Sequence, residues 1–281
     1  MLNTNNQILH GDCEKILKGF SDKFCQLIVT SPVYADIENK YQNGYKGPTP
    51  EEYGNWMIPK VKEFSRIIKD SGAFVLNIDS RVKNGFESIY VYDLVCRIVR
   101  ETDFKLWDTL FWSKLKGLPL QNRFWNKCEF LFVFVKQKNF KFNIDPFRTE
   151  YAKSSIYRMK SPIKKRFART KENQEKCEFK EWQPNELGAL PSNLLEISSE
   201  NQRISDSHVA CFPISLPEKF ILGMTDQNDI VVDPFCGTGS TLLAAYKNNR
   251  KFIGIDIDSD YVKFSSERIG KYEKSRIANS I

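Results

Sequence analysis

The segment DIVVDPFCGTGSTLLAAYKNNRKFIGIDID, residues 229–258, constrains the fold of this chain more than any other. It predicts a strand, a glycine-rich turn, a helix and a second strand. Because a crossover helix joins strands that run parallel in one sheet, this unit indicates an α/β protein. Gly237 and Gly239 let the backbone pass close to a ligand, and Asp256 ends the second strand, where a carboxylate can accept both hydroxyls of a ribose. Position 242 is Leu where a dinucleotide site would have a third glycine, so we expect a compact adenosine ligand.

The rest of the chain continues this alternation of strands and helices, with one interruption. Residues 136–204 are polar, basic and poor in long apolar runs, so we expect an inserted module there. It would separate two halves of one domain, residues 1–135 and 205–281. The predicted strands are 26–30, 73–78, 130–135, 229–233 and 251–256, and segments 103–112 and 129–136 are predicted to form an antiparallel pair. The predicted helices are 51–70, 87–101 and 215–224, with one more after the glycine turn.

The inserted module carries the positive charge of the chain, whose formal net charge is +7. Residues 136–181 hold fourteen Lys or Arg against six Asp or Glu, a local charge of +8, so all other residues together sum to about −1. A concentrated basic segment suits a polyanion such as nucleic acid, because neutralised phosphates supply affinity that does not depend on base sequence. A solvated basic loop is the alternative interpretation.

Cysteine and histidine usage narrows the chemistry. The seven cysteines form no Cys-x-x-Cys pair, which argues against a disulfide framework and a zinc site, and we expect no metal. With two histidines, the chain is poor in the bases that hydrolases favour. No apolar run is long enough for a membrane span and the first residues show no signal-peptide pattern, so we expect a cytoplasmic protein without a membrane partner.

Several stretches resemble the motifs of one enzyme family. DPFCGTGST followed by GIDID resembles the motif pair that binds the methyl donor in the β group of DNA amino-methyltransferases. LIVTSPVY, residues 27–34, resembles the catalytic motif of that family, commonly Ser-Pro-Pro-Tyr or Asp-Pro-Pro-Tyr, with Val33 in place of the second proline. Further matches, in the family's permuted order, are HGDC at 10–13, RFWNKCEFLFVFVK at 123–136 and HVACFP at 208–213.

The resemblance implies a fold and a set of site residues. The fold is an α/β, Rossmann-like, S-adenosylmethionine-dependent methyltransferase fold, permuted, with a mixed seven-stranded sheet, helices on both faces and a small target-recognition insert. Ser31 and the carbonyl of Pro32 would accept hydrogen bonds from the amino group of a base flipped out of the duplex, and Tyr34 would stack on that base. Cys236 would pack and would not act as a nucleophile. The residues expected to bind S-adenosylmethionine are Asp12, Cys13, Thr30, Phe212, Pro213, Asp233, Phe235, Gly237, Gly239, Ser240, Thr241 and Asp256, and those expected to contact DNA are Arg158, Lys164, Lys165, Arg166 and Arg169, with Tyr157 and Trp182 as further candidates.

Ser-Pro-x-Tyr resembles the cytosine variant of the catalytic motif, so we expect methyl transfer to N4 of cytosine in double-stranded DNA, as in restriction-modification systems. Adenine N6 is the alternative target. Two alternatives come from other classes of protein. One is a methyltransferase that acts on a small molecule or a protein, which would not need the basic insert. The other is a catalytically silent protein that binds the methyl donor or DNA. A cognate restriction endonuclease and a homodimer are left open as partners.

Overall fold

The computed structural model describes residues 6–36, 47–114, 124, 126–159, 184–198 and 212–278. Within them the strands are β1 (Gln7–His10), β2 (Cys25–Thr30), β3 (Ile68–Ile78), β4 (Val82–Lys83), β5 (Phe86–Glu87), β6 (Lys105–Ser113), β7 (Cys128–Val135), β8 (Leu194–Glu196), β9 (Ile230–Asp233) and β10 (Lys251–Asp256). The helices are α1 (Cys13–Leu17), α2 (Pro50–Ile67), α3 (Tyr90–Glu101), α4 (Lys153–Met159), α5 (Ser215–Met224), α6 (Ser240–Lys247) and α7 (Ser259–Ala278), with a short 3-10 helix, η1 (Asp145–Phe147).

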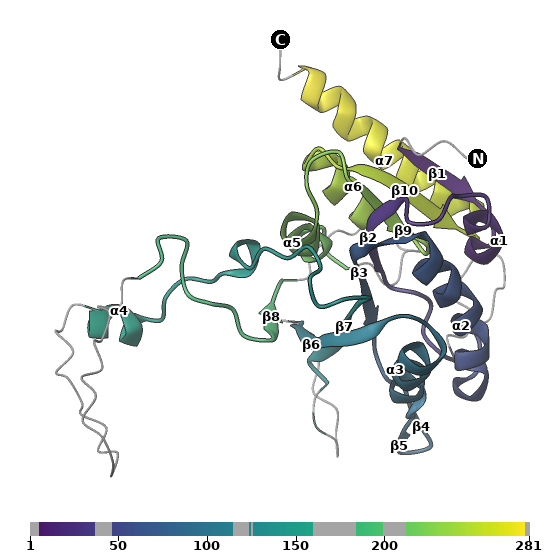
Figure 1. The fold of residues 1–281 in the computed structure, drawn as a ribbon, viewed down its shortest axis with the longest axis horizontal. Coiled ribbons are helices and arrows are strands. Elements are labelled where there is room, and N and C mark those ends of the chain that lie inside the picture. Colours follow the sequence, from purple (N-terminus) through teal and green to yellow (C-terminus); the bar gives the residue numbers. More distant parts are fainter. Residues whose placement is uncertain are drawn as a thin grey trace. The chain divides into compact units, whose positions relative to one another are not determined.

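Eight of the described strands form one sheet, in the order β1-β10-β9-β2-β3-β7-β6-β8. The five strands from β1 to β3 run parallel, β7 is antiparallel to both of its neighbours, and β8 is parallel to β6. Figure 1 shows β1, in purple from the start of the chain, beside β10, in yellow-green near its end. The two strands from the end of the chain, β10 and β9, therefore lie between β1 and β2.

Helices cover the two faces of the sheet in two groups (Figure 1). α1 and α3 each pack against α2, and α5 and α7 each pack against α6. α2 begins at a capping box, in which the Thr49 hydroxyl accepts from the Glu52 backbone and the Glu52 carboxylate accepts from the Thr49 backbone. Its buried side chains, which include Met57, Val61 and Phe64, recur with helical spacing and face the sheet.

The core between the sheet and the first helix group is rich in aromatic rings. Phe74 of β3 lies 5.4 Å from Phe64 of α2 and 5.5 Å from Phe134 of β7, measured between ring centroids. Residues 73–78 of β3 and 131–135 of β7 are buried at consecutive positions, so both faces of the sheet are covered there and the burial does not alternate. Burial of these strands fixes the centre of the sheet, from which the loops of the site extend.

Residues Ile144–Ser192 form a separate compact unit, and Met1–Asn143 together with Asn193–Ile281 form the other. In the smaller unit, Thr149 and Ala189 form an antiparallel bridge, and Arg148 donates to the carbonyl of Gly188 at 2.9 Å. The smaller unit lies inside the insert expected at 136–204. The flanking segments 136–143 and 193–198 belong to the larger unit, where 194–196 form β8.

The α/β sheet expected from the sequence is confirmed, and the structure differs from the expectation in one strand and in the start of one helix. Seven strands make up the expected mixed sheet, and β8 adds an eighth at its edge. The helix predicted from residue 87 begins at Tyr90, because Asn84 and Gly85, with φ of 52° and 81°, turn the chain into the β4–β5 hairpin first. Among the described helices, none combines the length and the apolar character that crossing a bilayer requires.

Candidate active site

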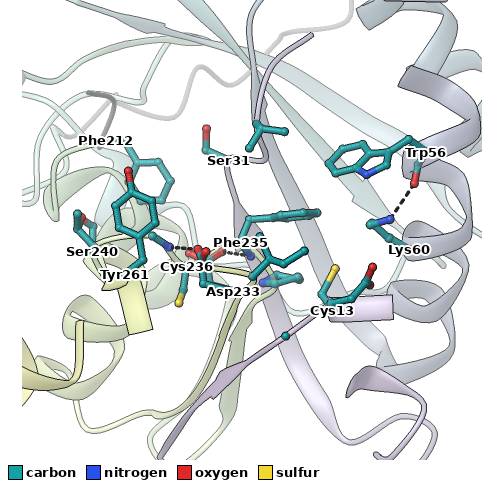
Figure 2. A pocket seen from close by; sticks show the side chains of 18 residues that line it. Cys13, Ser31, Trp56, Lys60, Phe212, Asp233, Phe235, Cys236, Ser240 and Tyr261 are labelled. Carbon is teal, nitrogen blue, oxygen red and sulfur yellow. Dashed lines mark hydrogen bonds between the residues drawn. The ribbon is translucent and has the colours of Figure 1, made fainter. Parts of the chain in front are cut away.

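A pocket lies at the carboxyl ends of four parallel strands, β1, β10, β9 and β2, and Figure 2 shows its side chains. Parallel strands end at the same edge of a sheet, so segments far apart in the chain meet there, and open α/β sheets bind their ligands in this position. The lining consists of Gly11, Asp12, Cys13, Ser31, Val33, Trp56, Lys60, Phe212, Asp233, Pro234, Phe235, Cys236, Gly237, Thr238, Ser240, Asp256, Ile257 and Tyr261.

The glycine turn between β9 and α6 forms the floor of the pocket. Gly237 and Gly239 have φ of 47° and 77°, which L side chains rarely adopt. A Cβ on Gly237 would meet no protein atom within 4 Å, whereas one on Gly239 would lie 2.9 Å from Cβ of Ser265. Gly237 therefore faces open space in the pocket. Gly239 lies outside the lining and is needed for the packing of α6, whose N-cap it is.

The carboxylate of Asp256 is held at the pocket by two backbone amides. Its Oδ2 accepts from the N–H of Gly237 at 2.8 Å, and its Oδ1 accepts from the N–H of Asp258 at 3.0 Å. Burial raises the pKa of this carboxyl above its ordinary value, and the two amides oppose that shift. Each oxygen keeps a free lone-pair direction. A ligand with neighbouring hydroxyl groups could therefore donate to both oxygens.

Asp233, at the end of β9, joins the floor of the pocket to β2. Its Oδ1 accepts from the Thr30 hydroxyl at 2.6 Å and from the N–H of Phe235 at 3.2 Å. Burial raises the pKa of the Asp233 carboxyl to about 6, although the hydrogen bond from Thr30 lowers it. Thr30 and Thr241 are fully buried and lie outside the pocket lining. Both were expected to touch the ligand. Thr30 instead donates to Asp233, and the buried Thr241 hydroxyl has no hydrogen-bond partner among the described residues.

The segment after β1 supplies the opposite wall. Asp12 is the N-cap of α1 and accepts from the N–H of Glu14 at 2.8 Å. Burial raises the pKa of the Cys13 thiol to about 12, so this cysteine stays protonated and uncharged against a ligand. Cys236, in the floor, is likewise buried with a pKa raised well above its usual value. It packs against Gly254, as expected for a structural cysteine.

Two side chains of α2 complete this wall, and sequence reasoning missed both. Trp56 lies 5.6 Å from Phe235, measured between ring centroids, and the ammonium of Lys60 lies 4.7 Å from the centre of the Trp56 ring. Lys60 also donates to the carbonyl of Trp56 at 3.1 Å, and its side chain is 8% exposed. Figure 2 shows the pair on the α2 side of the pocket. The sequence does contain a signal for Lys60, because it is a charged residue next to Val61 among the apolar positions of a predicted helix.

The loop after β2 brings Ser31 and Val33 to the pocket, whereas Pro32 and Tyr34 lie outside its lining. The carbonyl of Val33 accepts from the hydroxyl of the fully buried Tyr53 at 2.7 Å. Arg81 donates to the carbonyl of Ala35 at 3.1 Å. These contacts hold the loop from outside, at the position where the family motif has a stiffening proline.

The remaining expected residues divide between the pocket and other places. Phe212 and Ser240 line the pocket together with Tyr261, which the sequence analysis did not select, while Pro213 is buried beside it. Arg158 is in α4, Tyr157 is 75% exposed, and nothing is described of the Arg158 side chain. Lys164, Lys165, Arg166, Arg169 and Trp182 lie outside the described residues, so their role as DNA contacts stays a prediction.

Comparisons with known proteins agree on one family. A family model described as DNA methylase matches residues 25–267. The type II methyltransferase M.PvuII of Proteus hauseri is 28% identical over 94% of this chain and 84% of its own length. The solved PvuII DNA methyltransferase (cytosine-N4-specific) matches the fold with a TM-score of 0.70, at 24% identity over 94% of this chain and 86% of that one.

Two further proteins are similar over nearly the whole chain. The DNA adenine methyltransferase YhdJ of Escherichia coli (strain K12) is 25% identical over 99% of this chain and 90% of its own length. A DNA modification methylase of Thermus thermophilus, described as putative and solved in complex with S-adenosyl-L-methionine, matches with a TM-score of 0.62 at 19% identity, over 95% and 93% of the two chains. With a family match over residues 25–267, most of its length, the chain belongs to the N4/N6 DNA methylase family and is a DNA methyltransferase.

Proposed function

We propose that this chain transfers a methyl group from S-adenosylmethionine to N4 of cytosine in duplex DNA. The observation that carries the proposal is one pocket lined both by the Asp256 carboxylate, which is bonded to the glycine turn, and by Ser31 of the catalytic motif, with residues from both halves of the chain. The similarity to the cytosine-N4-specific PvuII enzyme and to a fold solved with S-adenosyl-L-methionine supports the same assignment.

The lining fits an adenosyl group. Asp256 has free lone pairs for two ribose hydroxyls, and Gly237 leaves the backbone open to a ligand. Asp12 lies on the wall across from this turn and offers a carboxylate to an exocyclic amine, while Phe235 presents an aromatic face. Phe212 lies on the same side of the pocket as Ser240 and Tyr261, across from Trp56 and Lys60, where the methionine part would lie (Figure 2).

The reaction needs a nitrogen lone pair directed at the methyl carbon. The Ser31 hydroxyl and the carbonyl of Pro32 each accept a hydrogen bond from one N–H of the amino group. These two hydrogen bonds turn the nitrogen lone pair out of the plane of the base. The nitrogen then forms the new N–C bond while the C–S bond breaks and its electron pair returns to sulfur. The proton that the nitrogen loses passes to solvent. Bound S-adenosylmethionine supplies the electrophilic methyl group.

DNA binding is assigned to the basic insert, where Arg158, Lys164, Lys165, Arg166 and Arg169 would contact the phosphate backbone. The +8 charge of residues 136–181 supports this role. Replacing Lys164, Lys165, Arg166 and Arg169 together by Gln should weaken DNA binding and reduce the dependence of log Kd on log salt concentration by about 3 to 4. Binding of S-adenosylmethionine should not change.

The decisive experiment is methylation of unmodified plasmid DNA by the purified chain with isotopically labelled S-adenosylmethionine, followed by mass spectrometry of the nucleosides. We expect N4-methylcytosine in one sequence context. N6-methyladenine as the sole product would replace the cytosine assignment with the adenine activity, which the similarity to YhdJ favours. A silent protein that binds the methyl donor would give neither product, and the Ser31→Ala variant is the matched blank.

A further inference from the structure

A buried carboxylate, Glu129, lies behind the catalytic loop, and the proposed reaction leaves it without a task. It is in β7, and its side chain is 8% exposed. Its Oε2 accepts from the hydroxyl of Tyr34 at 2.8 Å and from the side-chain amide of Asn77 at 3.0 Å. Its Oε1 forms an ion pair with Lys114. Both carboxylate oxygens are therefore engaged, one by Tyr34 and Asn77 and the other by the ammonium of Lys114.

The hydrogen bonds around Glu129 have a definite direction. An ionised carboxylate can only accept, so Tyr34 has to donate its single hydroxyl hydrogen to Glu129. Tyr34 also lies 3.5 Å from Oδ1 of Asn77, but the shorter, charged acceptor is the stronger one. With its hydrogen committed, the Tyr34 oxygen can only accept from other groups. This phenol is partly buried, and burial raises its pKa well above the ordinary value, so it keeps that hydrogen.

The direction set by Glu129 continues to Ser31. The Ser31 hydroxyl lies 3.4 Å from the Tyr34 oxygen, which is the next acceptor in the chain of hydroxyls. When Ser31 directs its hydrogen at Tyr34, its lone pairs are left for the pocket that Ser31 lines. When Ser31 directs its hydrogen into the pocket, it competes for the lone pair of the substrate nitrogen.

We propose that Glu129 is a positioning residue that acts through Tyr34 to hold Ser31 as a hydrogen-bond acceptor toward the amino group of the target base. The inference rests on the proposed function and deepens it, because it names what orients Ser31. The consequence for the reaction is that the amino group donates to Ser31 and keeps its own lone pair for the methyl carbon. Glu129 does not touch the base, and its effect requires the Tyr34 hydroxyl.

Glu129→Gln tests the direction of the chain with almost no change in shape. The ammonium of Lys114 takes the amide oxygen, so the amide NH₂ faces Tyr34 and reverses the hydrogen bonds. We expect kcat to fall about 100-fold, as for other losses of alignment in an active site. The KM for S-adenosylmethionine and its binding, followed by Trp56 fluorescence, should stay within about twofold. Glu101→Gln, which breaks a 2.6 Å ion pair with Arg97 on α3, is the control and should leave kcat unchanged.

A double-mutant cycle separates positioning from a structural role. In a Tyr34→Phe background the hydroxyl that links Glu129 to Ser31 is already missing, so adding Glu129→Gln should lower kcat by less than about twofold more. A full further loss of kcat in that background, or an unchanged kcat in the single Glu129→Gln variant, overturns the inference and leaves the proposed function standing. A wild-type chain that yields no methylated nucleoside overturns both. Thermal unfolding of all four proteins shows whether the losses come from misfolding.

Discussion

The two sides of the pocket are built in opposite ways. The turn after β9 is held by its own backbone: the N–H groups of Cys236 and Gly237 donate to the Ile255 carbonyl and the Asp256 carboxylate at the end of β10, the strand adjacent to β9. The loop after β2 depends on distant side chains, since Tyr53, Arg81 and Glu129 reach it from 20, 46 and 95 residues away. The turn after β9 needs Gly237 and Gly239, because their positive φ values are rarely adopted by other residues. The loop after β2 is held by side chains from outside the motif, so it can have Val33 at a position where the motif has proline.

This difference predicts that changes on the β2 side alter the rate and that changes in the turn alter binding of the methyl donor. Ser31→Ala should give the largest effect, a fall in kcat of about 1,000-fold, because one preorganised hydrogen-bond partner of the reacting group is lost. Its Kd for S-adenosylmethionine, measured by calorimetry, should stay within about twofold. Ser266→Ala, exposed on α7, is the control. A large rise in Kd would contradict the division between the two sides.

Asp256→Ala should have the next largest effect, on binding instead of rate. Removing the carboxylate eliminates two charged hydrogen bonds to the ribose, so Kd for S-adenosylmethionine should rise about 100-fold. At a saturating concentration of the methyl donor, kcat should recover to within a few fold of the wild type. Asp260→Ala, on the exposed face of α7, should bind normally. If kcat stays low at saturation, the turn also aligns the reacting groups.

Lys60→Met should weaken binding of S-adenosylmethionine about tenfold, because the buried ammonium offers hydrogen bonds that Met cannot. Lys62→Met, on the same helix with an exposed side chain, is the matched control. Equal Kd values for the two variants would assign Lys60 to packing against Trp56 alone. Equilibrium dialysis with labelled methyl donor measures both.

The smallest effect concerns the loop at Val33. Tyr53→Phe removes the 2.7 Å hydrogen bond to the Val33 carbonyl and should lower kcat about fivefold, the equivalent of one neutral hydrogen bond. Val33→Pro alone should change kcat by less than about twofold, because Tyr53 already holds the loop. Added to Tyr53→Phe, the proline should recover part of the loss. No recovery would mean that the loop does not need stiffening at this position.

The sequence was sufficient for elements whose contacts are local. The strand, glycine turn, helix and strand from 229 to 256 form as expected, and Gly237 and Asp256 are bonded to each other at the pocket. Thr30 and Thr241 were assigned to the ligand on motif position alone, but both are fully buried outside the pocket lining, and Thr30 donates to Asp233. In each case the next or preceding residue of the motif, Ser31 or Ser240, lines the pocket. Only the burial of individual side chains separates those that line a pocket from those that support it.

By itself, the sequence determined the family, the order of the motifs and the ligand turn, because each depends on residues adjacent in the chain. Tertiary structure alone decided that Trp56 and Lys60 of α2 form a wall, and that Tyr34 donates to Glu129. Those contacts exist because β2 lies between β9 and β3 and because β7 pairs with β3. Strand order in a sheet depends on which apolar faces are buried together, which no single segment of the chain encodes.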